Sequence, residues 1–165
     1  MSYEVLANDQ IQYFATAPGA TGSEADTLLR ITEDTAFDPK VDLETYDPKY
    51  KDRTVQPSNV LGEKATYDYD IDHNVGSPMQ EALYAIEDER NVPGKVMRVD
   101  MFKKQGEGFA AKMSDCSWTP NPIDAKPGEP INHTGICTRT GAWIFGIATL
   151  SADMATATFV PLDED

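Results

Sequence analysis

The stretch from residue 64 to residue 103 constrains the fold most, because its pattern predicts a strand, a short helix and a second strand. In Lys64–Asp72 aromatic or apolar side chains alternate with polar ones, so the acids share one face of the expected strand. Ser77 and Pro78 then occupy the positions of a helix N-cap and a first helical residue. A Pro-Gly pair ends the helix, and Lys95–Phe102 alternates again as a second strand.

The expected helix covers about residues 78–90 and is apolar on one side. Its apolar side chains are spaced at i, i+3, i+4 and i+7, which places them on one stripe. The stripe consists of Met79, Ala82, Leu83 and Ile86. A helix with one apolar stripe has to cover a sheet, so these four residues are the candidates for packing it there.

The rest of the chain reads as strands separated by proline and glycine. Residues 1–26 are weakly patterned and predict an N-terminal arm, and residues 38–60 predict a long loop or open hairpin between core strands. Four later runs are β-rich, at 109–119, 131–140, 142–150 and 154–160. Residues 1–165 therefore predict a single, mainly β domain, a β-sandwich or half-barrel with one flanking α-helix.

The charge of the chain narrows the classes of partner. Lys and Arg number 14 against 28 Asp and Glu, which gives a net charge of -14. Such a surface repels nucleic acid and anionic membranes. It is still compatible with DNA that moves past the protein without binding to it. No apolar run approaches the roughly 20 residues that span a bilayer, and the N-terminus lacks the pattern of a secretory leader. We expect a soluble protein made inside a cell.

The two cysteines and two tryptophans are expected to be structural. Cys116 and Cys137 are too few for a disulfide framework, and we expect them to be buried thiols. A single disulfide between them is the alternative. Trp118 and Trp143 could form a platform for a sugar ring. Both lie in apolar strand runs, which favours packing in the core or at a subunit interface.

No pattern in the chain indicates catalysis. His73 and His133 are distant in the sequence, and neither stands beside a nucleophile. The motifs GxSxG, HExxH, GxGxxG, CxxC and the P-loop are all missing from the sequence. We therefore predict surface or turn histidines, no catalytic residue, no cofactor and no enzyme.

One calcium-binding pattern deserves comparison with a structural explanation. The residues at positions 1, 3, 5 and 12 of a calcium loop are Asp70, Asp72, Asn74 and Glu81. Against it, Val75 takes the place of the required glycine, and Pro78 already starts the helix. A strand with a solvated acidic face followed by a capped helix explains the same residues. No metal site is predicted, and calcium stays the weaker alternative.

The order of parts over residues 60–161 resembles the major tail tube proteins of long-tailed, siphovirus-like phages. The resemblance rests on a turn, a helix, a charged strand, a glycine-containing hairpin and a β-rich ending. These parts are Asn74–Pro78, Met79–Leu83, Lys95–Asp100, the hairpin into 109–119, and Ala157–Pro161. It is a pattern of parts and not a signature motif.

The resemblance implies a structural virion protein that forms rings, hexameric in this family, which stack into a tube for DNA ejection. Its partners would be further copies of itself and other tail proteins, such as the tape measure and terminator proteins. DNA would pass through the lumen without specific binding, and no membrane would take part. The protein would be assembled in the host cytoplasm and end in the phage tail.

The resemblance also suggests roles for particular residues. Asp68, Asp70 and Asp72 are candidates for facing the lumen, where carboxylates would repel phosphate and let DNA slide. Plain solubility is the other explanation of this acidic face. The loop at 38–60 and the arm at 1–26 are expected to contact stacked rings. Alternative functions are a capsid decoration or other virion β-protein, and a carbohydrate- or calcium-binding β-sandwich module.

Overall fold

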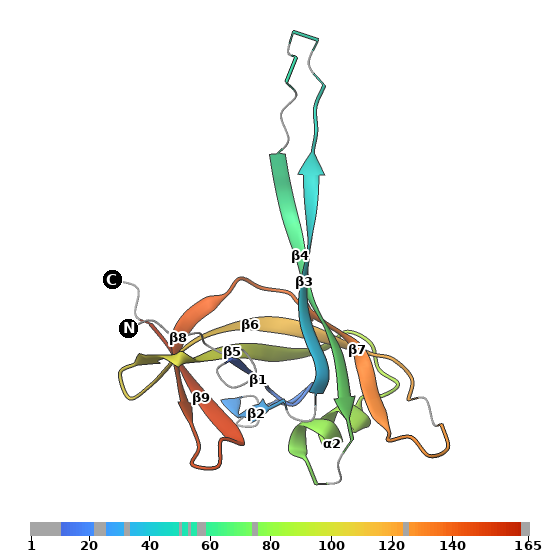
Figure 1. The fold of residues 1–165 in the computed structure, drawn as a ribbon, viewed down its shortest axis with the longest axis vertical. Coiled ribbons are helices and arrows are strands. Elements are labelled where there is room, and N and C mark those ends of the chain that lie inside the picture. Colours follow the sequence, from blue (N-terminus) through green and yellow to red (C-terminus); the bar gives the residue numbers. More distant parts are fainter. Residues whose placement is uncertain are drawn as a thin grey trace.

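A computed structural model gives the fold of the chain and describes residues 11–21, 26–31, 34–49, 51–52, 54–55, 59–73, 76–123 and 126–162. In these residues nine antiparallel β-strands and one α-helix are present (Figure 1). The elements are β1 (Ile11–Ala15), β2 (Leu28–Arg30), β3 (Asp34–Tyr46), β4 (Asn59–Asp72), α2 (Pro78–Ala85), β5 (Val92–Gln105), β6 (Gly108–Pro120), β7 (Asn132–Arg139), β8 (Ile144–Leu150) and β9 (Thr156–Pro161).

Six strands close into a barrel. Their order is β1, β5, β6, β8, β9 and β2, and β2 pairs back onto β1. The short strand β2 makes the closure, with Leu28 opposite Ala157 of β9 and Arg30 opposite Phe14 of β1. Closure gives each barrel strand a hydrogen-bonded neighbour on both sides over at least part of its length, which limits exposed edges.

Strand β6 belongs to the barrel along its first half and to an open sheet along its second half. Phe109–Met113 pair with β8, whereas Cys116–Pro120 pair with β7. From β7 the sheet continues to β4 and then to β3. Side chains alternate along a strand, so Ala111, Met113 and Asp115 share one face of β6. Ala111 and Met113 pack in the barrel core, whereas Asp115 lies beyond the barrel and is exposed.

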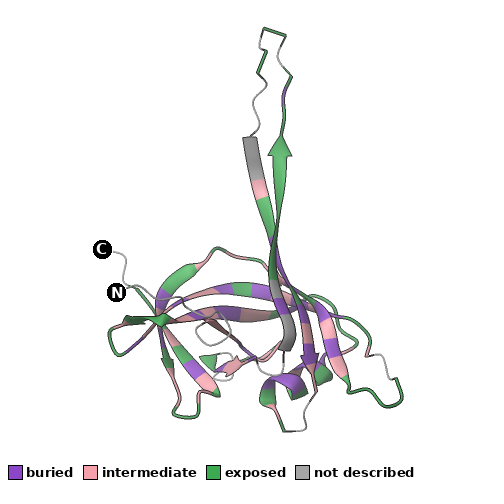
Figure 2. Cartoon of the chain, in the orientation of Figure 1, coloured by how far each residue is buried: buried purple, intermediate pink, exposed green. Residues whose placement is uncertain are grey.

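Strands β3 and β4 form a long hairpin that projects from the barrel (Figure 1). Their pairing runs from Asp34 opposite Ile71 to Tyr46 opposite Asn59. Strand β4 pairs with β7 only from residue 66 to residue 72, so its outer part has no second neighbour among the described residues. Most of the described outer part of the hairpin is exposed (Figure 2).

The buried side chains form two clusters on opposite sides of the barrel wall. The cluster inside the barrel takes Phe14, Leu28, Met97, Val99, Ala111, Ala148 and Ala157, so all six barrel strands contribute to it. The second cluster lies between the outer side of the sheet and α2. It includes Val96 of β5, Trp118 of β6 and Leu83 of α2, which are 0%, 0% and 1% exposed.

Helix α2 begins as predicted but ends earlier. Pro78 is its first residue, yet the side chain of Ser77 makes no capping hydrogen bond. The α-helix stops at Ala85, five residues before the predicted end near residue 90. Beyond it the N–H groups of Ile86 and Glu87 donate to carbonyl groups three residues back, which tightens the chain into turns.

The prediction of a mainly β fold with one flanking helix is confirmed. The hairpin of β5 and β6 and the three later strands also lie close to their predicted runs. One segment contains more structure than expected, because residues 11–15 of the expected arm form β1. Of the segment expected as a long loop or open hairpin, residues 38–46 belong to β3 and 59–60 to β4, as in a hairpin. No helix in the described part of the chain is long and apolar enough to cross a membrane.

Candidate functional site

The acidic residues of β4 share one face of the sheet, as the alternation predicts. Asp68 is exposed, and Asp70 and Asp72 are partly buried. On the opposite face Tyr69 and Ile71 are buried in the outer core cluster, 3% and 0% exposed. The two faces of β4 therefore differ sharply, with a core on one side and carboxylates on the other.

Neighbouring strands extend this acidic face with polar side chains and with one exposed apolar residue, Ile136. On β7 the residues opposite Asp68, Asp70 and Asp72 are Ile136, Thr134 and Asn132. The face continues on β6 with Thr119, which is opposite Ile136 of β7, and with Ser117. Both β6 residues are partly buried. We name the set Asp68, Asp70, Asp72, Asn132, Thr134, Ser117 and Thr119 the polar sheet face. It carries carboxylates and hydroxyl groups on the side of the sheet away from α2.

The predicted packing stripe of the helix faces the core. Met79, Leu83 and Ile86 are buried in the outer core cluster, and Ala82 is partly buried. The stripe thus holds α2 against the side of the sheet opposite the polar sheet face. Gln80 is buried as well, at 1% exposed, although its polar side chain carried no signal for burial in the sequence.

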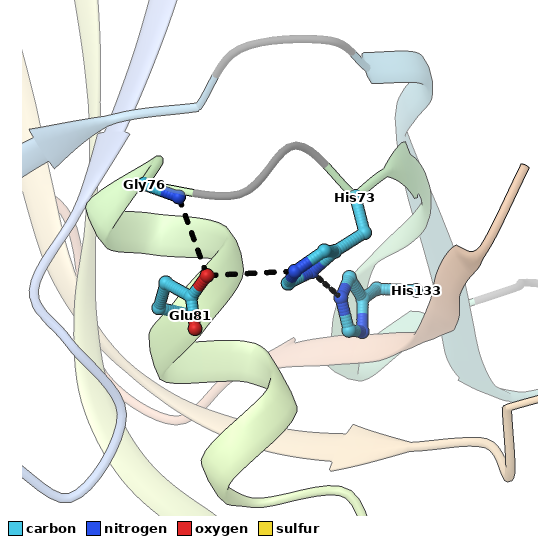
Figure 3. A network of polar contacts seen from close by, with 4 residues as sticks. All are labelled: His73, Gly76, Glu81 and His133. Carbon is cyan, nitrogen blue, oxygen red and sulfur yellow. Dashed lines mark hydrogen bonds and ion pairs between the residues drawn. The ribbon is translucent and has the colours of Figure 1, made fainter.

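The structure joins the two histidines in one polar network (Figure 3). Nδ1 of His73 lies 2.7 Å from Nε2 of His133, and Nε2 of His73 lies 3.5 Å from Oε1 of Glu81. The same carboxylate oxygen accepts the N–H of Gly76 at 3.4 Å. The network connects the end of β4, the first turn of α2 and the start of β7. The prediction of a surface or turn histidine is wrong for His133, which is buried in β7, whereas His73 lies just after the end of β4 and is partly buried. The pairing of β4 with β7 brings the two together.

The position of Glu81 favours one arrangement of protons in this network. A carboxylate beside Nε2 of His73 favours a proton on that nitrogen, which leaves Nδ1 as an acceptor. Nε2–H of His133 can then donate to Nδ1 of His73. At 2.7 Å the two facing nitrogens share one proton, so they cannot both carry an N–H at the same time.

His133 is the buried member of the pair. Its side chain is 5% exposed, and burial together with the neighbouring His73 lowers its pKa, while Glu87 and Glu81 act in the opposite direction. The neutral form of His133 is therefore favoured in the folded protein.

The calcium pattern is not assembled by the residues that the structure describes. Glu81 faces His73 and Gly76, whereas Asp70 and Asp72 lie on the polar sheet face, and Asn74 is outside the described residues. No group of three His, Cys, Asp or Glu side chains among the described residues is arranged to hold a metal ion.

The tryptophans have different surroundings. Trp118 is fully buried in the outer core cluster, with its ring centre 5.3 Å from that of Tyr69. Trp143 is partly buried, and its ring is flanked by Lys112 and Arg139 at 4.6 Å and 4.9 Å. These cation–π contacts occupy the Trp143 ring, so the two tryptophans do not form a shared sugar platform.

The cysteines are buried free thiols, as expected. Cys116 of β6 and Cys137 of β7 are 3% and 0% exposed. A hydrogen bond with the Cys116 thiol, followed by burial, raises the pKa of the Cys137 thiol well above its ordinary value. A thiol kept protonated in this way is a poor nucleophile.

No protein-family model matches the chain, and no curated protein matches its sequence.

Proposed function

We propose that this protein is a structural subunit that assembles with copies of itself into stacked rings, forming the tail tube of a siphovirus-like phage. In this proposal the tube is the conduit for DNA ejection, and other tail proteins contact its ends. The barrel with its sheet extension and flanking helix is the tail-tube-like domain. The resemblance in the order of parts is the starting point of the proposal.

The projecting β3–β4 hairpin is the observation that carries the proposal. Val41, Leu43 and Tyr46 on its outer part are 52%, 57% and 53% exposed. The apolar face of the hairpin begins in the core at Phe37 and Tyr67, whose rings stack with centres 4.8 Å apart, and continues outward to Val41 and Leu43. Exposed apolar surface on a projecting strand pair is typical of a segment that another protein chain covers.

The polar sheet face supports a lumenal role for its acids. Helix α2 and the outer core cluster cover the other side of this sheet, so Asp68, Asp70 and Asp72 stand on the side without that cover. In a ring of subunits this side would form the wall of the channel. Carboxylates there would repel phosphate and let DNA slide without binding.

Electron microscopy of the purified protein tests the proposal. A concentration series in negative stain is expected to contain hollow tubes or stacked rings, with sedimentation velocity reporting the matching growth in size. A particle that stays monomeric at every concentration would contradict the proposal. Glycan-array binding by such a monomer would favour the alternative of a carbohydrate-binding module.

The location of the acids needs a structure of the assembled tube. We expect the side chains of Asp68, Asp70 and Asp72 to face the channel. Tubes with these side chains on the outer surface, or buried between subunits, would contradict the lumenal role while leaving self-assembly intact.

A further inference from the structure

The outer face of the barrel has a depression of about 340 Å³ that gathers positive charge in an acidic protein. Three basic residues, Arg98, Lys103 and Lys112, line it together with one acidic residue, Asp100, although the whole chain has only 14 basic residues. Phe145 and Leu162 also line it and are 62% and 44% exposed. Cations beside exposed apolar side chains are typical of a protein interface and need a partner that offers both acids and apolar groups. We name the three basic and the two apolar residues the basic groove.

The basic groove has two unlike sides because of the strand order. Arg98 and Lys103 belong to β5 and Lys112 to β6, whereas Phe145 belongs to β8 and Leu162 follows β9. Strands β5, β6, β8 and β9 are consecutive around the barrel, so the cations lie on one side and the apolar groups on the other. The N–H of Leu162 donates to the carbonyl oxygen of Phe145 at 3.1 Å, which holds the apolar side together.

Part of this positive charge is not balanced by nearby carboxylates. Arg98 makes two hydrogen bonds to Asp100, at 2.9 Å and 3.1 Å. Within the described residues, no carboxylate forms an ion pair with Lys103 or Lys112. Burial and the positive charges of Arg98 and Arg139 lower the pKa of Lys112, while Asp100 acts in the opposite direction. A further carboxylate beside Lys112 would favour its charged form.

The outer part of β3 has the matching pattern. Residues 41–44 alternate apolar and acidic side chains, with Val41 and Leu43 on one face and Asp42 and Glu44 on the other. All four are exposed. No strand among the described residues pairs with the other edge of β3, which leaves room for the strand to lie lengthwise in a groove. Its two faces would then meet the two sides of the basic groove.

We propose that the basic groove receives residues 41–44 of a second copy of this chain, with Asp42 and Glu44 toward Lys103 and Lys112 and Val41 and Leu43 toward the apolar side. The occupant is a second copy because the chain's own β3 is paired with β4 and projects away from the barrel (Figure 1). The inference rests on the proposed self-assembly and names the contact surface that it uses.

Charge reversal on each side tests the contact. The groove variant Lys103→Glu/Lys112→Glu and the strand variant Asp42→Lys/Glu44→Lys are each expected to need at least about a tenfold higher concentration for half-maximal association in sedimentation velocity. Lys104→Glu is the matched control, because Lys104 is the exposed neighbour of Lys103 and does not line the groove. It is expected to associate like the wild type. Lys103→Glu alone, which leaves the Lys112–Trp143 contact intact, guards against a folding defect.

Mixing the two double variants gives the sharpest outcome. The groove variant retains a normal strand, and the strand variant retains a normal groove, so this contact can form between them. The other contact of the mixture pairs the two reversed sets of charges, which are again opposite in sign. We therefore expect the mixture to associate at lower concentration than either double variant alone.

Two results would overturn the inference. A groove variant that associates like the wild type would show that assembly uses another surface, and the proposed function would survive. A mixture that gives no complex, from variants with native circular dichroism, would exclude the pairing of this groove with this strand. A wild-type protein that never associates would instead contradict the proposed function itself, so the two failures are distinguishable.

Discussion

Nδ1 of His73 lies 2.7 Å from Nε2 of His133, although the two residues are 60 positions apart in the chain. The contact follows from the pairing of β4 with β7, which sets Asp72 opposite Asn132 and lets the N–H of His73 donate to the carbonyl oxygen of Ile131 at 2.8 Å. Glu81 of α2 adds the third member. One polar network therefore links the helix to two strands that carry the polar sheet face.

This network predicts a loss of stability in mild acid. The folded-state pKa of His133 is depressed below its ordinary value of 6.5. The unfolded chain consequently takes up a proton that the folded chain resists, and stability falls as pH drops through the unfolded pKa. Urea unfolding should show a lower midpoint at about pH 5.5 than at about pH 8, with a smaller difference in His133→Gln.

The variant His73→Gln serves as the control for this pH effect. It removes the neighbouring imidazole but leaves His133 buried, and burial is the larger cause of the lowered pKa. Part of the pH dependence should therefore persist. Equal pH dependence in the wild type and His133→Gln would contradict the assignment.

Truncation of the helix stripe should destabilise the fold. Leu83 is 1% exposed in the outer core cluster, so Leu83→Ala leaves a cavity between α2 and the sheet. We expect a loss of about 2–5 kcal/mol in the free energy of unfolding, measured by urea denaturation. Tyr84→Ala, at a neighbouring position that is 57% exposed, should cost much less, about 0.5 kcal/mol. Similar losses in the two variants would mean that the stripe does not hold the helix.

Gly146 should be intolerant of a side chain. A Cβ at this position in β8 would clash with the carbonyl oxygen of Val160 and lie 2.6 Å from Cζ of the Phe159 ring. Gly146→Ala should lower the free energy of unfolding by about 1–3 kcal/mol by forcing β8 and β9 apart. At Gly62 in β4 an added Cβ meets no atom within 4 Å, so Gly62→Ala should be neutral or stabilise by up to about 1 kcal/mol. Equal thermal midpoints for the two variants would refute this packing.

The buried thiols should resist modification until the protein unfolds. Cys116 and Cys137 are almost completely buried, and the raised pKa of Cys137 keeps its thiol protonated. Alkylation by iodoacetamide should be slow in the native protein at about pH 7 and remain slow at about pH 9, then become fast in urea. Rapid labelling of the native protein, read out by mass spectrometry, would contradict the burial of the pair.

Shortening the hairpin should separate folding from assembly. Asp42 and Lys64 are register partners, so residues 43–63 can be replaced by Asn-Gly, a two-residue turn suited to a β-hairpin. The truncated protein should remain folded by circular dichroism, because its two core clusters are retained. Electron microscopy should then show no tubes. Tubes of wild-type appearance would exclude the hairpin from assembly.

Local patterns in the sequence determined the elements of this protein. Alternation over residues 64–72 and 95–102 predicted β4, β5 and the side on which Asp68, Asp70 and Asp72 lie. The spacing of Met79, Leu83 and Ile86 predicted which side of the helix is buried. These features depend on residues within a few positions of one another, so they can be read without knowing which strands pair.

Tertiary structure alone decided the barrel closure, the change of partner along β6, the histidine pair and the basic groove. Each depends on strands that are distant in the chain, such as β4 with β7 or β5 with β6 and β8. Periodicity states which side of a strand faces the core, but it does not state which strand lies beside it. Neighbours across a sheet are chosen by the joint packing of all elements, and that choice brought His73 to His133 and Lys112 beside Phe145.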